Sequence, residues 1–321
     1  MLDLWVFVDE PSTTSFPSFP PLVLQTGIAI TPISRRTWNS RGWTSIEKKG
    51  GTGWGERVRS EIQKDSSVRV HWVGLPVPSE ELFNLKKKEA VSVHLYLDQL
   101  PKDSEDLPWE SLDSVRVPSF FFRHRLRRIF PEKKNRILLV HPVPRPCYSR
   151  WDRDGHKRRT QLRHAWGCSE KRVLLVERDD LQKREIRFLK KITEEISTTR
   201  KDAVTLWIPN EGRGKSEPEN RNDRRLAADW LLTGGTLRRS LCPLHVEALA
   251  CGTPVLTTDT GDHGEWIRHG YSGLLLETEH WRSELKMYLQ RLAEAPRLTR
   301  DLGVNGRRLY ETYLRTGEDS R

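Results

Sequence analysis

The stretch that decides the fold is SLCPLHVEALACGTPVLTTDTGDHGEWIRHGYSGLLLE, residues 240–277. Its first part predicts a helix that Gly252 ends, because glycine just after a helix and proline just beyond it are usual stop signals. Pro254 then opens a buried strand, and a glycine-bearing turn leads to another helix start and a further short strand. This order is typical of an open α/β sheet, in which ligands lie beyond the carboxyl ends of the strands. Glu247 sits inside the apolar helix, where a charge is unfavourable unless it has a partner.

Strands and helices alternate along most of the chain. Apolar runs that read as strands occupy residues 3–8, 68–75, 90–97, 136–144, 171–180 and 203–209. An amphipathic helix is expected at 182–196, a basic helix near 120–130, and a helical region up to about residue 314. Such alternation predicts an α/β fold built on parallel, doubly wound sheets.

The chain is long enough for two domains of ordinary size. We expect an N-terminal domain at residues 1–145 and a C-terminal domain at 146–321, joined by a Pro-rich, charged and aperiodic segment at about 142–160. Residues 11–49 show no sustained period and are expected to be irregular, apart from one strand near 22–30.

Composition limits the class of protein. The formal net charge is +11, which favours contact with polyanions such as nucleic acid, acidic lipid head groups or phosphorylated substrates. The basic runs are spread along the chain, so a solvated basic surface is the alternative, and no nucleic-acid-binding motif is present. The four cysteines have no metal-binding spacing. No apolar run reaches the roughly 18 residues of a membrane span, and the N-terminus does not read as a signal peptide. We therefore expect a cytoplasmic protein with reduced thiols and no metal.

The opening stretch resembles the C-terminal domain of GT-B glycosyltransferases of the retaining family 4 type. The matching positions are Glu247, Ala248, Ala250, Gly252, Pro254, Val255, Gly261, Glu265, Gly270, Gly273 and Leu275. The resemblance implies that Glu247 holds the ribose hydroxyls of a nucleotide-sugar donor, and that Gly261 and Glu265 belong to the donor-binding turn. The family carries another Glu eight residues before Glu247, associated with the transferred sugar, and Arg239 stands at that position. Arg239 either turns inward to pair with Glu247 or turns outward to solvent.

Two cations form a candidate diphosphate site. Arg178 is expected at the end of a strand, and Lys183, five residues later, at the start of the following helix. Cations at a helix N-terminus favour an anion together with the helix dipole, although two exposed charges on a basic helix would look the same in sequence. The pattern resembles the family's Gly-Arg-x-x-x-x-Lys, whose cations neutralise the leaving nucleoside diphosphate. Here Glu177 replaces the glycine.

The N-terminal half offers weaker candidates. The loop Gly50–Gly55 contains Gly53, Trp54 and Gly55, and backbone without Cβ can approach a sugar or phosphate closely. The resemblance places these residues beside the donor, while a flexible hairpin is the alternative. His94 and Asp98 fall on or just past a strand that the family directs toward its cleft, and a satisfied structural histidine is the alternative there.

The resemblance implies two Rossmann-like domains that face each other across a cleft, the N-terminal on the acceptor side and the C-terminal on the donor side. The C-terminal domain is shortened, because only about 17 residues separate two of its strands where the family has a further helix–strand–helix unit. The implied activity is retaining transfer of a hexose from a nucleoside-diphosphate sugar to an acceptor hydroxyl, with Glu247, Arg178 and Lys183 as catalytic residues and no cofactor. The acceptor would be a glycan, a lipid or a protein, and the basic surface would suit peripheral membrane contact. A catalytically degenerate binding protein is the competing interpretation.

Overall fold

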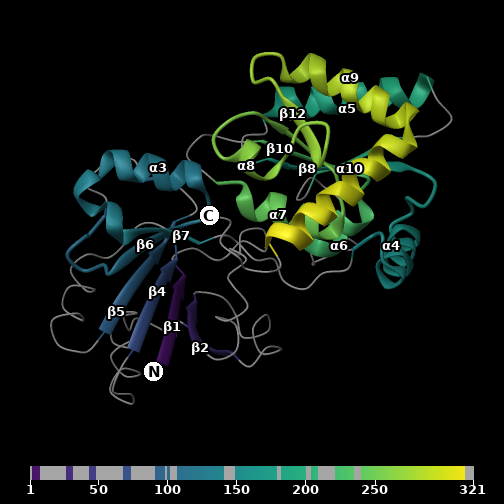
Figure 1. The fold of residues 1–321 in the computed structure, drawn as a ribbon. Helices are drawn as coiled ribbons and strands as arrows, with labels where there is room; N and C mark the ends of the chain where they lie inside the picture. Colours follow the sequence, from purple (N-terminus) through teal and green to yellow (C-terminus); the bar gives the residue numbers. More distant parts are fainter. Residues whose placement is uncertain are drawn as a thin grey trace. The chain divides into compact units, whose positions relative to one another are not determined.

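The computed structural model describes residues 2–7, 27–31, 43–47, 68–73, 91–97, 100–101, 107–140, 149–178, 182–199, 204–208, 221–234 and 240–314. The chain divides into two compact units (Figure 1). The N-terminal unit comprises Met1–Pro142 with Arg238–Ser240, and the C-terminal unit comprises Val143–Leu237 with Leu241–Arg321.

The N-terminal unit is built on a seven-stranded parallel sheet. Its strands are β1 (Leu2–Phe7), β2 (Gly27–Thr31), β3 (Trp43–Glu47), β4 (Val68–Val73), β5 (Val91–Tyr96), β6 (Ser114–Val117) and β7 (Ile137–Leu139). They lie in the order β3-β2-β1-β4-β5-β6-β7, which is the doubly wound arrangement.

The two faces of this sheet differ over β4, β5 and β6. One face carries apolar side chains that pack against Phe122 and Leu126 of α3 (Phe120–Ile129), which Figure 1 shows beside β6 and β7. Successive side chains of a strand point to opposite faces. The other face therefore carries the polar residues Arg69, His71, His94, Tyr96 and Arg116. A short 3-10 helix, η5 (Pro131–Arg136), connects α3 to β7.

The C-terminal unit is built on a five-stranded parallel sheet in the order β12-β11-β10-β8-β9. Its strands are β8 (Arg172–Arg178), β9 (Val204–Trp207), β10 (Trp230–Gly234), β11 (Val255–Thr258) and β12 (Gly273–Leu276). Its helices are α4 (Arg153–Ala165), α5 (Lys183–Thr199), α6 (Arg221–Ala227), α7 (Cys242–Cys251), α8 (His263–Trp266), α9 (Trp281–Glu294), α10 (Pro296–Leu309) and the π-helical turn η6 (Tyr310–Leu314). The parallel sheets of both units confirm the predicted α/β class.

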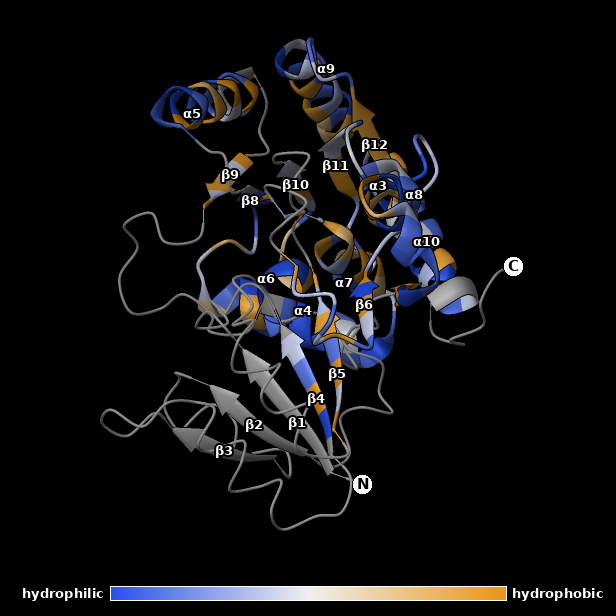
Figure 2. Ribbon diagram, turned by 90° about the vertical axis from the view of Figure 1, so that its left-hand side faces the viewer, coloured by the Kyte–Doolittle hydropathy of each residue, from blue (hydrophilic) through white to orange (hydrophobic). Residues whose placement is uncertain are grey.

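Helices cover both faces of this second sheet. Leu174 and Val176 of β8 pack with residues of α5 and α9 on one face, whereas Val173 and Leu175 pack with residues of α7 on the other. Blue and orange run side by side along α5 and α9 in Figure 2, as expected for helices with one buried face.

The decisive stretch folds as its sequence predicts. Gly252 ends α7 with a left-handed backbone (φ 70°), which glycine adopts without steric cost. β11 follows after Pro254, and its four residues are all buried. β12 begins at Gly273, where an added Cβ would lie 2.3 Å from the backbone oxygen of Val255 on the paired strand.

A buried ion cluster fixes α4 to the amino edge of the sheet. Asp229, just before β10, accepts from Arg159 (2.8 Å) and Arg163 (3.0 Å) of α4, and also from the backbone N–H of Val173 (2.8 Å). Arg163 donates in addition to the carbonyl oxygen of Ala227 (2.8 Å). Arg150 donates to Thr253 Oγ1 (3.0 Å), and its burial, followed by the nearby Arg159, lowers its pKa to about 9.

Three elements differ from the predictions. β3 lies within residues 11–49, which the sequence predicted to hold one strand at most. α6 overlaps the stretch of about 17 residues between two predicted strands, where no helix was expected. α4 begins at Arg153, inside the predicted join at 142–160, because Gly155 lets the helix pack where an added Cβ would lie 1.7 Å from Ser149 O. No helix within the described ranges has the length and apolarity needed to cross a membrane.

Candidate functional site

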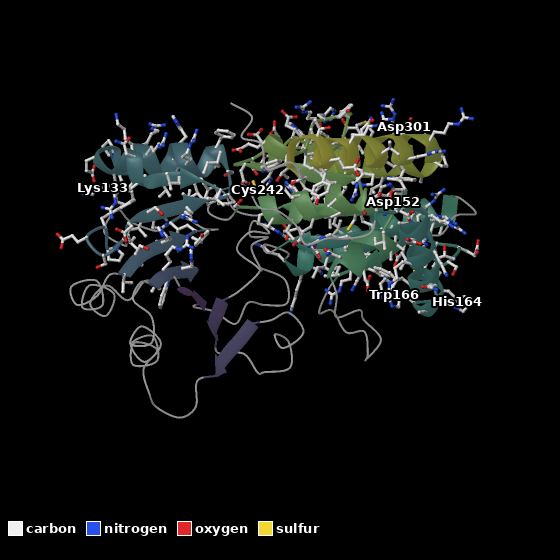
Figure 3. The ribbon with its side chains drawn as sticks, turned by 60° about the horizontal axis from the view of Figure 1, so that its bottom comes forward. Lys133, Asp152, His164, Trp166, Cys242 and Asp301 are labelled. Atoms are coloured by element: carbon white, nitrogen blue, oxygen red, sulfur yellow. The ribbon has the colours of Figure 1, made fainter. Side chains whose placement is uncertain are left out.

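The carboxyl edge of the C-terminal sheet is the expected position of a ligand site. The strand order reverses direction between β8 and β10, and open parallel sheets bind ligands at the carboxyl ends beside such a reversal. Glu177 and Arg178 end β8, opposite Thr233 and Gly234 of β10. Figure 3 labels Cys242, which follows this edge at the start of α7, and it lies far from His164 and Trp166, which precede β8.

Arg225 of α6 joins two acidic residues at this edge. Its side chain is fully buried, and its Nη2 donates to Glu177 Oε2 at 2.8 Å while its Nη1 donates to Glu247 Oε2. Burial alone would lower the pKa of Arg225, but the two carboxylates raise it above the usual arginine value. The guanidinium is therefore charged, and it contacts both carboxylates.

Three atoms of the cluster and its surroundings are buried without a hydrogen-bond partner in the described part of the chain: Arg225 Nε, Glu177 Oε1 and His245 Nδ1. His245, on α7, shares a 2.9 Å hydrogen bond between its Nε2 and Thr233 Oγ1. Burial, and then the neighbouring His263 and Arg225, lower the pKa of His245 well below its usual value, so the ring is neutral at physiological pH. Buried polar groups in native proteins usually have partners, so such atoms often mark binding sites.

The structure gives Glu247 the partner that its place in an apolar helix demands. Its side chain is 11% exposed and pairs with Arg225, a residue that the sequence did not single out. A signal was present, because a buried carboxylate needs a cation, but Arg225 stands among other arginines in the short stretch between two predicted strands. Arg239, the partner considered from sequence, lies outside the described residues.

The predicted diphosphate pair lies at the same edge. Arg178 is the last residue of β8. Lys183 is the first residue of α5, and its side chain is exposed. The side chain of Arg178 is outside the described part, so their convergence on one anion stays a prediction. Glu185 occupies part of the helix start by accepting from the backbone N–H of Gln182 at 2.7 Å.

The turn after β11 is attached to the start of α7. Gly261 has a left-handed backbone (φ 61°), and Glu265 is a half-buried residue of α8. Between them, Asp262 accepts from the backbone N–H of Leu241 (3.3 Å) and from Cys242 Sγ (3.2 Å). Hydrogen bonds therefore join the turn to the helix that bears Glu247.

The remaining candidates belong to the N-terminal half. Gly53, Trp54, Gly55 and Asp98 lie outside the described residues. His94 shares a 2.8 Å hydrogen bond between its Nδ1 and Ser114 Oγ, and its ring lies 5.5 Å from that of His71. Within the described part of the chain, no cluster of His, Cys, Asp or Glu has the arrangement of a metal site.

A comparison with known protein families matches the segment that contains α7 and the turn after β11. Residues 240–309 match the family described as Glycosyl transferases group 1. Over 89 residues the chain is 28% identical to a putative glycosyltransferase, YtcC, of Bacillus subtilis (strain 168). That alignment covers 28% of this chain and only 22% of the relative.

Solved structures resemble nearly the whole chain. A glycosyltransferase from Rickettsia africae has a TM-score of 0.63 at 12% identity, covering 97% of this chain and 93% of its own. Anabaena HepE in complex with UDP has a TM-score of 0.61 at 11% identity, covering 97% and 95%. Sucrose-phosphate synthase from Thermosynechococcus elongatus has a TM-score of 0.59 at 16% identity, covering 97% and 94%. At these identities the resemblance establishes the fold.

Proposed function

We propose that this chain transfers a hexose from a nucleoside-diphosphate sugar to an acceptor hydroxyl with retention of configuration. The support is the GT-B fold of glycosyltransferases and the group 1 glycosyl transferase match at residues 240–309. The observation that carries the proposal is Glu247. It lies within the matched segment, it is nearly buried, and Arg225 holds it on the sheet face beside Glu177, which ends β8.

Different residues would bind the ribose and the diphosphate of the nucleotide sugar. Glu247 would accept hydrogen bonds from the ribose hydroxyls, because a fixed carboxylate is a strong acceptor for hydroxyl donors. Arg178 and Lys183 would stabilise the negative charge that develops on the diphosphate as the sugar leaves. Fixed cations at a helix start supply this stabilisation, so the proposal requires no metal ion.

The similar structures support the donor class. Anabaena HepE was solved with UDP-glucose, and the pneumococcal O-GlcNAc transferase GtfA was solved with UDP and GlcNAc. We extend a nucleotide-sugar donor and a glycan, lipid or protein acceptor to this chain by analogy of fold and of the matched segment.

A second candidate is a catalytically inactive binding protein. The observation that favours it is the pair of departures at the edge: Glu177 replaces the glycine of the family pattern, and Arg239 replaces its first glutamate. Such a protein would bind the nucleotide without turning the sugar over.

We also propose a cytoplasmic location with peripheral membrane contact through α3. This helix exposes Phe120 (44%) and Ile129 (39%) and carries Arg127 and Arg128 in its last turn. Apolar and basic side chains together suit an anionic bilayer surface. Sedimentation with vesicles that contain anionic lipid, compared with neutral vesicles, tests this contact, and equal sedimentation with both would contradict it.

The decisive experiment measures release of UDP, GDP or ADP from the corresponding nucleotide sugars. The Glu247→Gln variant should lose turnover, while Asp223→Asn serves as the matched control. Asp223 belongs to α6, as does Arg225, but it pairs with Arg158 of α4 (2.8 Å). Turnover that survives in Glu247→Gln would remove Glu247 from the mechanism. Nucleotide binding without any turnover in the unaltered protein would select the inactive candidate.

A further inference from the structure

We propose that Glu177 is a second hydroxyl-binding carboxylate of the donor site, so that Glu177 and Glu247 each accept one hydroxyl of the donor's ribose while Arg225 holds both carboxylates in place. This inference rests on the proposed function, because the ligand is the nucleotide of the donor. It assigns a role to the residue at which this chain departs from the glycine of the family pattern.

The position of Glu177 directs it toward α7. Side chains two residues apart on a strand share a face. Val173 and Leu175 pack into the same core as α7, so Glu177 lies on that face at the end of β8. Its neighbour across the sheet is Thr233, at the end of β10. Glu177 therefore stands at the strand ends beside the reversal of strand order, where a ligand of such a sheet is expected.

The hydrogen bonds of Glu177 are incomplete. Oε2 accepts from Arg225 Nη2 at 2.8 Å, whereas Oε1 is buried and has no partner within the described ranges. The side chain is only 8% exposed. Leaving a buried carboxylate oxygen without a donor is costly, so a native protein keeps such an oxygen where a ligand supplies the donor.

The shared guanidinium sets the spacing of the two carboxylates. Because Nη1 and Nη2 of Arg225 each donate to one carboxylate, oxygens of Glu177 and Glu247 lie within about 6 Å of each other. The two hydroxyls of a vicinal diol fit between acceptors at this spacing, with about 2.7 Å to each carboxylate.

The charge of the cluster selects the same chemistry. Two carboxylates meet at this point, where Arg225 contacts both of them. A phosphate would be repelled at this point, whereas a neutral hydroxyl would donate to a charged acceptor. The two carboxylates therefore suit the ribose diol, whereas the diphosphate would bind Arg178 and Lys183.

The test compares affinities for intact and deoxygenated nucleotides. Isothermal titration calorimetry measures the binding of UDP, GDP and ADP, and then of the 2′-deoxy and 3′-deoxy forms of the nucleotide that binds. In the unaltered protein, the dissociation constant of each deoxy form should be at least about tenfold higher than that of the intact nucleotide, as expected for a lost hydrogen bond to a charged group. Glu177→Gln should lose the discrimination against one deoxy form, and Glu247→Gln the discrimination against the other.

Controls separate binding from folding. Glu177→Asp keeps the charge but shortens the side chain, so it should fold and still weaken one discrimination. Asp223→Asn should keep both discriminations. If Glu177→Gln and Glu177→Asp discriminate against both deoxy forms as the unaltered protein does, the inference is wrong while the proposed function stands. If the unaltered protein binds none of the three nucleotides and turns over no nucleotide sugar, the proposed function and this inference both fall.

Discussion

Among the described residues of the C-terminal unit, buried ion clusters lie at both edges of the sheet, and their bonding differs. At the amino edge one carboxylate, Asp229, is shared by Arg159 and Arg163, and both of its oxygens have partners. At the carboxyl edge one cation, Arg225, is shared by Glu177 and Glu247, and Glu177 Oε1 has none in the described part of the chain.

The difference separates structural from ligand-binding roles. Arg163 donates to the carbonyl oxygen of Ala227 as well as to Asp229, and Arg159 donates to Asp229, so this cluster connects α4, the sheet and the start of β10. Both oxygens of Asp229 are already used as acceptors, so neither is left without a donor that a ligand hydroxyl could supply. At the carboxyl edge, Glu177 Oε1 has no donor among the described residues. This edge lies where parallel sheets bind ligands.

The largest expected effect is the loss of the amino-edge cluster. Asp229→Asn leaves Arg159 and Arg163 buried without their carboxylate, and breaking a buried pair in this way costs about 3–5 kcal/mol. Urea denaturation of the unaltered protein and the variant measures the loss, and nucleotide affinity of the folded variant should be unchanged. A variant of near-normal stability would contradict the structural role.

Acid should remove the difference in stability between the unaltered protein and Asp229→Asn. Burial favours protonation of Asp229, but Arg159, Arg163 and Arg150 outweigh it and hold the pKa of this carboxyl below its usual value. The ionised carboxylate therefore stabilises the fold above the unfolded pKa of about 3.9, and this contribution is lost as the pH falls through the lower folded value. The stabilities of the unaltered protein and Asp229→Asn should converge in that range.

A smaller effect is expected at the carboxyl edge, on binding. Lys183→Ala should weaken nucleoside-diphosphate binding by about 1–3 kcal/mol, the range for a lost charged hydrogen bond. Stability should change little, because the side chain is exposed. Lys191→Ala is the matched control, since Lys191 is also exposed and lies farther along α5. Unchanged binding in Lys183→Ala would make Lys183 an ordinary surface charge.

The smallest effect concerns His245 and pH. The folded protein keeps this ring neutral, whereas the unfolded chain protonates it below a pKa of about 6.5. Stability should therefore fall as the pH drops below 6.5 toward the lower folded pKa, by at most about 1.4 kcal/mol per pH unit. His245→Gln should lose this dependence, and His164→Gln, an exposed control, should keep it. Parallel melting curves from pH 7.5 to 5 compare the three proteins.

Much of the fold could be predicted because its signals are local. Gly252 and Pro254 fix the end of α7 and the start of β11 within a few residues, and the apolar spacing of Leu189, Ile192 and Ile196 gives the buried face of α5. The start of α4 could not be predicted, because the role of Gly155 depends on its packing against Ser149. β3 and α6 are short and have weak patterns of their own.

The site was predictable only in part. Glu247 could be found because a single carboxylate stands out in an apolar helix. Its partner could not, because Arg225 lies 22 residues earlier and Glu177 lies a further 48 residues before Arg225. Nothing in the local sequence of α6 distinguishes Arg225, which is buried, from Arg224, which is partly exposed. Long-range ion pairs of this kind appear only when the sheet brings the strand ends together.

The most direct test of the account measures the thermal shift that UDP, GDP and ADP produce in the unaltered protein, Asp229→Asn and Glu247→Gln. A ligand that binds the folded state raises the melting temperature. We predict that Asp229→Asn melts at a lower temperature but keeps the nucleotide-induced rise, whereas Glu247→Gln loses most of that rise. Equal rises in Glu247→Gln and the unaltered protein, or a rise lost only in Asp229→Asn, would contradict the division of roles between the two edges.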